Sequence, residues 1–214
     1  TVYLLVDISA SGEFGSGQQL KREVGAEIAA VLGFSAIKNN DKVGLILFSD
    51  EIEKYVVPKK GKSHVLRVVR ELLYTEPQRT GTSIKCALDY LLKVAKRKSV
   101  VFIISDFLDQ DYWSSLKVVN RKHDVIGIRL YDHAETDMPD MGLAKVEDPE
   151  TGESFWVDTS SKDARTRLKK EIEVRQGIFQ KDTRKIGFDL IPISTNQDFV
   201  EPLMSFFRMR EKRY

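Results

Sequence analysis

The chain has 214 residues, of which 42% are hydrophobic, and a formal net charge of +2. This composition provides enough apolar side chains for a full core, so disorder is excluded as the default state. The near-neutral charge argues against an overall electrostatic attraction to nucleic acid. No apolar run reaches the roughly 20 residues of a membrane-spanning helix, so we expect no direct membrane insertion by this sequence.

The cysteine content and the first residue bear on the cellular location and on the extent of the protein. The single cysteine, Cys86, excludes an internal disulfide. It fits a reducing compartment, or simply a domain that needs no disulfides, and we expect a cytoplasmic location. The sequence starts at Thr1, inside an apolar run and without a methionine. We therefore expect residues 1–214 to be a single domain that belongs to a longer protein.

The first half of the chain alternates apolar runs with segments of helical periodicity. Short apolar runs predict buried strands over Val2–Val6, Lys42–Phe48 and Val100–Ser105. Apolar residues at helical spacing predict helices over Gln18–Ile37, Ser63–Tyr74 and Ser83–Lys96. Residues Ile52–Val57 alternate in polarity after a turn at 49–51, which predicts an antiparallel edge strand.

The second half continues this pattern and interrupts it once. A short helix over Tyr112–Asn120 and a strand over Val125–Leu130 come first. Leu143–Glu147 and Ser154–Val157 then flank a strong turn signal, which predicts a β-hairpin at the edge of the sheet. The last predicted elements are a helix over Lys162–Lys185, a strand over Phe188–Ile193 and a helix over Phe199–Arg213.

Alternating strands and helices predict the fold class. The order favours an α/β fold with a central, mostly parallel sheet, one antiparallel edge strand, helices on both faces and an extra β-hairpin.

Hydroxyl and carboxyl side chains lie at or near the ends of the predicted buried strands. They are Asp7, Ser9 and Ser11 after the first strand, Thr82 before a helix, and Asp106 after a later strand. Open parallel sheets bind ligands at the carboxyl ends of their strands. Because these side chains offer oxygen rather than thiolate or imidazole, the sequence predicts a site for Mg²⁺, Ca²⁺ or Mn²⁺ rather than Zn²⁺.

A plainer interpretation of these residues stays open. Ser9 and Ser11 could cap the following helix, and Asp7 and Asp106 could end their strands by chance. If the metal site exists, its neutral hydroxyls and few carboxylates would leave the cation electrophilic, with one position open for an external ligand.

The motifs Asp7-x-Ser9-x-Ser11, Gly81-Thr82 and Ser105-Asp106 resemble those of a von Willebrand factor A (VWA) domain with an intact metal-ion-dependent adhesion site, or MIDAS. The resemblance covers nearly the whole chain. The run from Val6 to Ser11 with the following Phe14-Gly15, and the run from Asp198 to Leu203, are similar to one bacterial branch. That branch is family 58 among the domains of unknown function, often accompanied by MoxR-type AAA+ ATPases.

The resemblance implies a Rossmann-like sheet with magnesium at its top. It implies that Ser9, Ser11 and Thr82 supply hydroxyl ligands, and that Asp7 and Asp106 act mostly through water. It further implies a protein partner that contributes an Asp or Glu, such as a MoxR-type ATPase or one of its clients. Gly12 departs from the pattern, because many relatives have methionine after the second serine; this position should not affect coordination.

Three functions follow from this sequence, and we favour a metal-dependent binding module that is not an enzyme. One alternative is a Mg²⁺-dependent phosphohydrolase with Asp7 as nucleophile. Such enzymes need a second Asp two positions later, where this chain has Ser9, which cannot supply a carboxyl proton. The other alternative is a structural scaffold with a vacant site.

Overall fold

The computed structural model describes residues 1–13, 15, 19–79, 81–136, 140–147 and 154–212. A six-stranded sheet forms its centre, in the order β3-β2-β1-β4-β5-β8. The strands are β1 (Val2–Asp7), β2 (Val43–Phe48), β3 (Ile52–Lys59), β4 (Val100–Ser105), β5 (Asp124–Tyr131) and β8 (Asp189–Ser194). Only the β2–β3 pair of this sheet is antiparallel. The predicted α/β class, with its mostly parallel sheet and antiparallel edge strand, is confirmed.

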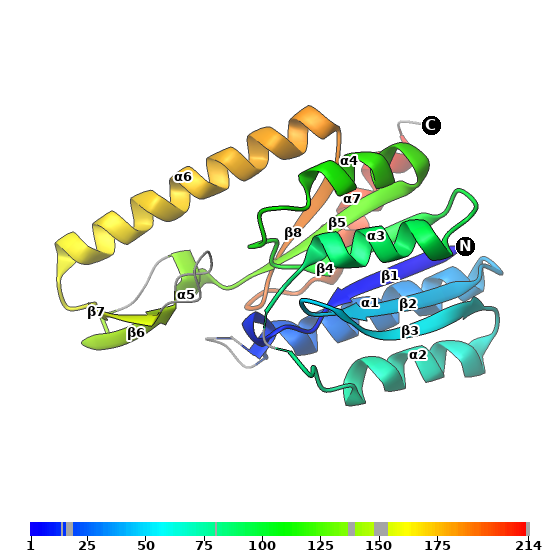
Figure 1. The fold of residues 1–214 in the computed structure, drawn as a ribbon, viewed down its shortest axis with the longest axis horizontal. Coiled ribbons are helices and arrows are strands. Elements are labelled where there is room, and N and C mark those ends of the chain that lie inside the picture. The colour runs from blue at the N-terminus through cyan, green and yellow to red at the C-terminus, as the bar shows by residue number, and fades with distance from the viewer. Residues whose placement is uncertain (14, 16–18, 80, 137–139, 148–153, 213–214) are drawn as a thin grey trace.

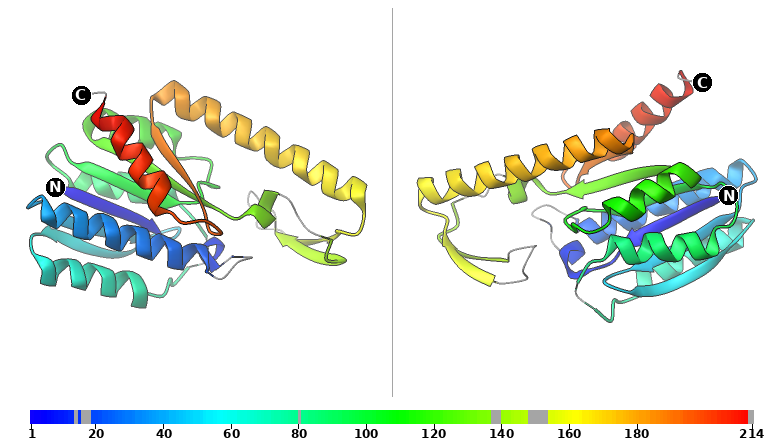
Figure 2. Two further views of the ribbon diagram at one scale, coloured as in Figure 1. Left: turned by 180° about the vertical axis from the view of Figure 1, so that it is seen from behind. Right: turned by 45° about the horizontal axis from the view of Figure 1, so that its top comes forward.

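Helices cover both faces of this sheet (Figures 1 and 2). One face carries α1 (Lys21–Lys38), α2 (Lys62–Tyr74) and α7 (Val200–Glu211), and the other carries α3 (Ile84–Val94) and α4 (Trp113–Lys122). Successive side chains of a strand point to opposite faces. Leu4 therefore joins the core under α1, whereas Leu5 joins the core under α3. Burial on both faces explains the continuous apolar runs of the sequence.

Helix α1 begins at Lys21, later than the predicted start at Gln18, a residue outside the described ranges. The carboxylate of Glu23 accepts a hydrogen bond from the backbone N–H of Leu20 at 3.0 Å. A side chain that caps the preceding backbone in this way fixes where a helix starts.

The strands β6 (Leu143–Glu147) and β7 (Ser154–Asp158) pair with each other as predicted, but they form a separate sheet. The prediction that this hairpin lies at the edge of the central sheet is wrong. The edge position beside β5 is taken by β8, which pairs with it from Ile126 to Tyr131. The turn between β6 and β7 lies outside the described residues.

The hairpin and the long helix α6 (Lys162–Ile186) form an arm that extends away from the central sheet (Figure 1). The short helix α5 (His133–Thr136) lies at its root, directly after β5. Near the other end of α6, the ring of Phe179 packs at 5.8 Å from that of Phe107 and at 5.6 Å from that of Trp113. These contacts attach the arm to the body. None of the described helices is both long and apolar enough to cross a membrane.

Two glycines provide a matched test of this packing. A Cβ atom at Gly127 on β5 would lie 2.4 Å from the ring of Phe188, whereas a Cβ atom at Gly177 on α6 would meet nothing within 4 Å. Gly127→Ala should lower the free energy of unfolding by about 1–3 kcal/mol through overpacking. Gly177→Ala should raise it by about 0.5–1 kcal/mol, because alanine restricts the unfolded chain. Urea unfolding measures both, and equal effects would contradict the described contact of β5 with Phe188.

Candidate metal centre

The carboxyl ends of β1 and β4 form the topological switch point of the sheet. Strand β1 pairs with β2 on one side and with β4 on the other. The chain leaves β1 through α1 towards β2 and later crosses back to enter β4 beyond β1. Connections that depart in opposite directions leave a crevice outside the strand ends, where doubly wound sheets bind their ligands. Asp7 ends β1 and Asp106 directly follows β4.

The loop after β1 brings together three of the five predicted residues. One carboxylate oxygen of Asp7 accepts a hydrogen bond from the backbone N–H of Ser9 at 3.0 Å. The hydroxyl oxygens of Ser9 and Ser11 lie 3.0 Å apart. The chain then continues as a short 3₁₀ helix, Ala10–Glu13. This tight turn presents two hydroxyls beside one carboxylate.

Thr82 lies half-buried in the loop that leads into α3. The next residue, Ser83, donates its backbone N–H to the carbonyl of Ser49, just past the end of β2, at 2.7 Å. The first residue of α3, Ile84, donates its backbone N–H to the carboxylate of Asp109 at 2.8 Å. These two hydrogen bonds hold the Thr82 loop at the same edge of the sheet, because Ser49 follows β2 and Asp109 follows β4.

The buried Asp106 is positioned by the turn that leaves β4. One of its oxygens accepts the backbone N–H of Leu108 at 3.2 Å. The intervening Phe107 has φ of 59°, in the left-handed region, where a bulky residue is strained and rare. Its buried ring packs against those of Tyr112 and Phe188 at about 6 Å. Core packing therefore holds a strained turn directly beside the candidate site.

The two carboxylates destabilise each other's charge. Burial, and then the nearby charge of Asp106, raise the pKa of Asp7 to about 6, although hydrogen bonds from Ser105 and Ser9 act in the opposite direction. The bond from the Ser105 hydroxyl is 2.7 Å long. A divalent cation between the carboxylates and the hydroxyls would relieve this repulsion. The donor set therefore fits a hard cation.

Among the described residues, no group of three His, Cys, Asp or Glu side chains is arranged to hold a metal ion. A cation at this edge would thus depend on hydroxyl oxygens in addition to Asp7 and Asp106. Such a ligand set suits Mg²⁺, which is bound through few protein ligands and keeps several waters. The assignment of the five residues as ligands stays a prediction.

Sequence reasoning missed two charged residues at this site. The ammonium group of Lys21 lies 3.3 Å from a carboxylate oxygen of Asp106 and also pairs with Glu135 of α5. The signal was present in the sequence, because Lys21 precedes Val24 and Ile28 on the apolar stripe of α1. A charged residue on a core-facing stripe needs a partner in the interior.

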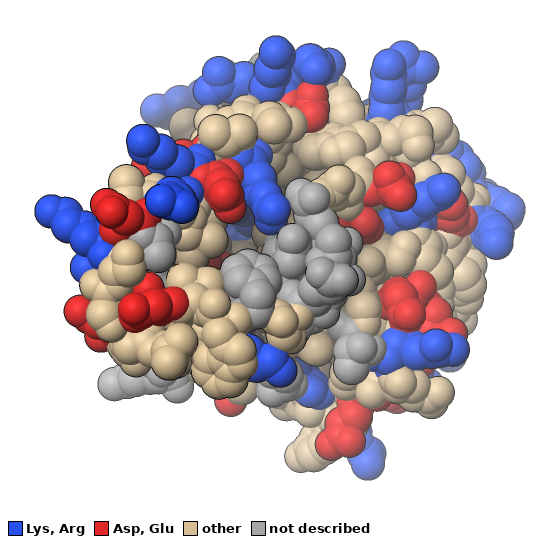
Figure 3. All heavy atoms as spheres, turned by 60° about the vertical axis from the view of Figure 1, so that its left-hand side comes forward, with Lys and Arg blue, Asp and Glu red and all other residues tan. Residues whose placement is uncertain are grey.

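Seen from the end of the molecule where the arm lies, Lys and Arg side chains predominate along the upper rim, whereas acidic and basic side chains are interspersed below it (Figure 3).

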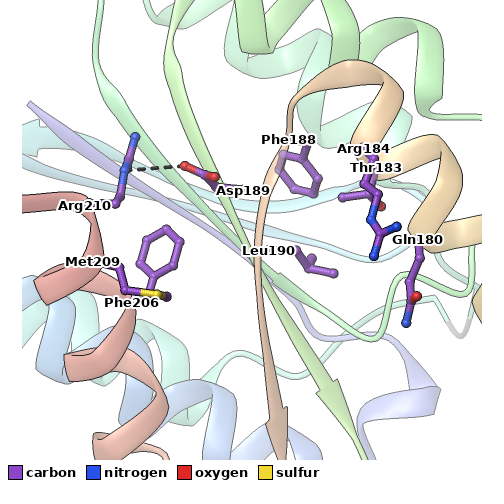
Figure 4. Close-up of a pocket in the computed structure, with 9 residues that line it drawn as sticks. All are labelled: Gln180, Thr183, Arg184, Phe188, Asp189, Leu190, Phe206, Met209 and Arg210. Carbon is purple, nitrogen blue, oxygen red and sulfur yellow. Dashed lines mark ion pairs between the residues drawn. The ribbon is translucent and has the colours of Figure 1, made fainter. Parts of the chain in front are cut away.

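A pocket of about 310 Å³ lies between the last turns of α6, the start of β8 and α7 (Figure 4). Arg210 extends beside it and pairs with Asp189 at 3.4 Å. Asp189 begins β8, whereas Asp7 and Asp106 lie at the carboxyl ends of β1 and β4. The pocket and the candidate metal centre are therefore at opposite ends of the sheet.

Residues 1–177 match the family model described as "Protein of unknown function DUF58". The chain belongs to this family. Uncharacterized proteins of Mycobacterium bovis and Mycobacterium tuberculosis are 25% identical to it over 217 residues, which cover 98% of this chain and 67% of each relative. The expected membership of family 58 is confirmed.

Solved structures are similar to this DUF58 chain in fold. An aerotolerance-related membrane protein from Bacteroides fragilis aligns with a TM-score of 0.61 at 15% identity, over 100% of this chain and 98% of that chain. BatB from Bacteroides thetaiotaomicron aligns with a TM-score of 0.58 at 15% identity, over 98% and 97%. The VWA domain of SpRpn10 aligns with a TM-score of 0.50 at 11% identity, over 95% and 92%. The fold is therefore VWA-like.

The raised pKa of Asp7 has a measurable consequence for metal-free protein. A carboxyl group whose pKa is raised on folding contributes stability that is present below its unfolded pKa of about 3.9 and lost as the pH rises through its folded value. Asn does not titrate. From pH 4 to pH 7 the stability of Asp7→Asn relative to wild type should therefore rise by about 1–3 kcal/mol. Urea unfolding in chelator measures the difference, and a falling difference would contradict the raised pKa that burial and the charge of Asp106 give Asp7.

Proposed function

We propose that this DUF58 chain is a metal-dependent protein-binding module. Ser9, Ser11 and Thr82 would hold the cation, with Asp7 and Asp106 close by, and a partner protein would supply an Asp or Glu as a further ligand. The observation that carries the proposal is the pair of hydroxyls 3.0 Å apart beside the carboxylate of Asp7, which accepts the backbone N–H of Ser9. The VWA-like fold supports it, and Asp7 and Asp106 lie at the ends of the neighbouring strands β1 and β4.

The bound cation would attract a carboxylate because few formal charges surround it. Three of the five proposed ligands are neutral hydroxyls, and the charge of Asp106 is shared with the ammonium group of Lys21 at 3.3 Å. The cation would therefore keep a net positive charge and an affinity for an external anion. Hard oxygen ligands are also those that Mg²⁺ prefers.

The arrangement favours binding over catalysis. Both oxygens of Asp7 already accept hydrogen bonds, from the Ser9 backbone and the Ser105 hydroxyl. Ser9 cannot replace the second carboxyl group that the alternative phosphohydrolase would use as general acid and base. We therefore propose no enzymatic turnover.

The family resemblance suggests the partner. We propose a MoxR-type AAA+ ATPase, or one of its clients, and a role in the assembly or maturation of a protein complex. A cytoplasmic location is part of the same proposal and rests on the single cysteine, Cys86.

Affinity for the purified MoxR-type ATPase of the same organism tests this function. Binding of the wild-type chain in Mg²⁺ should be lost in chelator. Thr82→Ala should weaken it by on the order of 10- to 100-fold, the effect typical of a disturbed metal site. Calorimetry gives these affinities, and a phosphatase assay on the same samples should show no turnover.

Ser63→Ala is the matched control, because it removes an exposed hydroxyl from α2 and should leave the affinity unchanged. Thermal unfolding in chelator should show that both variants are folded. Affinity that survives chelation and Thr82→Ala would mean that the metal face is not used, and phosphatase activity that depends on Asp7 would favour the hydrolase.

A further inference from the structure

Lys21 is an internal cation beside the candidate metal centre. Lys21 is only 2% exposed, and its ammonium group lies 3.3 Å from a carboxylate oxygen of Asp106. The same group pairs with the carboxylate of Glu135. These contacts join three different parts of the fold: the start of α1, the turn after β4, and α5 at the root of the arm.

The charge of this lysine is kept only because acidic groups lie beside it. Burial disfavours the charged form of lysine, and the positive end of a helix dipole disfavours a cation in the first turn, where Lys21 lies. The carboxylates of Asp106 and Glu135 oppose this effect, and the pKa of Lys21 is raised in spite of its burial. The arrangement therefore holds a positive charge directly beside Asp106, one of the carboxylates of the candidate metal centre.

We infer that Lys21 acts as a built-in counter-ion that lowers the affinity of the centre for a divalent cation, and that Glu135 offsets this effect by sharing the ammonium group. This inference rests on the proposed function and adds a form of regulation to it. Lys21 and the cation would both be attracted to Asp106, and their positive charges would repel each other.

The consequence is a centre that holds its cation weakly until a partner binds. A carboxylate from the partner would add the negative charge that the ammonium group of Lys21 cancels. Cation and partner would then bind cooperatively, because each strengthens the binding of the other. Glu135 extends this dependence to the root of the arm, since its other oxygen accepts the backbone N–H of Asp132, the residue between β5 and α5, at 3.2 Å.

Two single substitutions should change the cation affinity in opposite directions. Lys21→Met removes the positive charge and should tighten Mn²⁺ binding by on the order of ten-fold, the scale of one charge near a protein surface. Glu135→Gln removes the carboxylate that shares the ammonium group and should weaken binding by a similar factor. Calorimetric titration with Mn²⁺ at pH 8, well above the pKa of about 6 for Asp7, measures both.

Arg210→Met is the matched control. Arg210 is also a largely buried cation that pairs with two carboxylates, those of Asp124 and Asp189. These carboxylates begin β5 and β8, at the opposite end of the sheet from Asp106. Its loss should leave Mn²⁺ affinity unchanged. Lys21→Gln provides a second neutral variant if Lys21→Met fails to fold, and Glu135→Gln tests the inference independently of both.

The outcomes separate this inference from the proposed function. Tighter binding in the Lys21 variant and weaker binding in Glu135→Gln support the inference. If the wild-type chain binds Mn²⁺ and the Lys21 variants bind it equally well or more weakly, the inference about Lys21 is wrong. The proposed metal centre would still be supported. If neither wild type nor the Lys21 variants bind Mn²⁺, both are wrong, because removal of the counter-ion would have revealed any site that it suppresses.

Discussion

The repulsion between Asp7 and Asp106 is the constraint on which the rest of this site depends. The sheet places both carboxylates at the carboxyl ends of neighbouring strands. Asp106 is buried and Asp7 is half-buried, so water screens their charges poorly. Two contacts offset this repulsion: the Ser105 hydroxyl donates a hydrogen bond to Asp7, and the Lys21 ammonium group pairs with Asp106. In the proposed function, a divalent cation would offset it further and would also bind a carboxylate of the partner.

The fold class and much of the candidate site were predictable from the sequence, because they depend on local patterns. Apolar runs such as Val43–Phe48 marked strands buried on both faces. Asp7 and Asp106 were noticed because each follows such a run. Their proximity could be predicted without long-range contacts, because parallel strands place their carboxyl ends at one edge of the sheet.

The errors came from competition between distant segments and from charged residues. The hairpin formed by β6 and β7 lies away from the central sheet because β8, encoded after it, takes the place beside β5. No local sequence pattern shows which of two segments will pair with the edge strand of a sheet. Lys21 was overlooked because a lysine is normally solvated. Its burial is explained by carboxylate partners that lie 85 and 114 residues further along the chain.

The central claim is that hydroxyls at this edge hold a divalent cation. Anomalous diffraction from crystals soaked in Mn²⁺ tests it most directly, since the signal locates the ion without reference to any partner. The account predicts one strong peak within coordination distance of the hydroxyl oxygens of Ser9, Ser11 and Thr82, and no such peak in crystals of a Ser9→Ala, Ser11→Ala double variant. A saturating soak that gives no peak there, or a peak that persists in the double variant, would contradict the account.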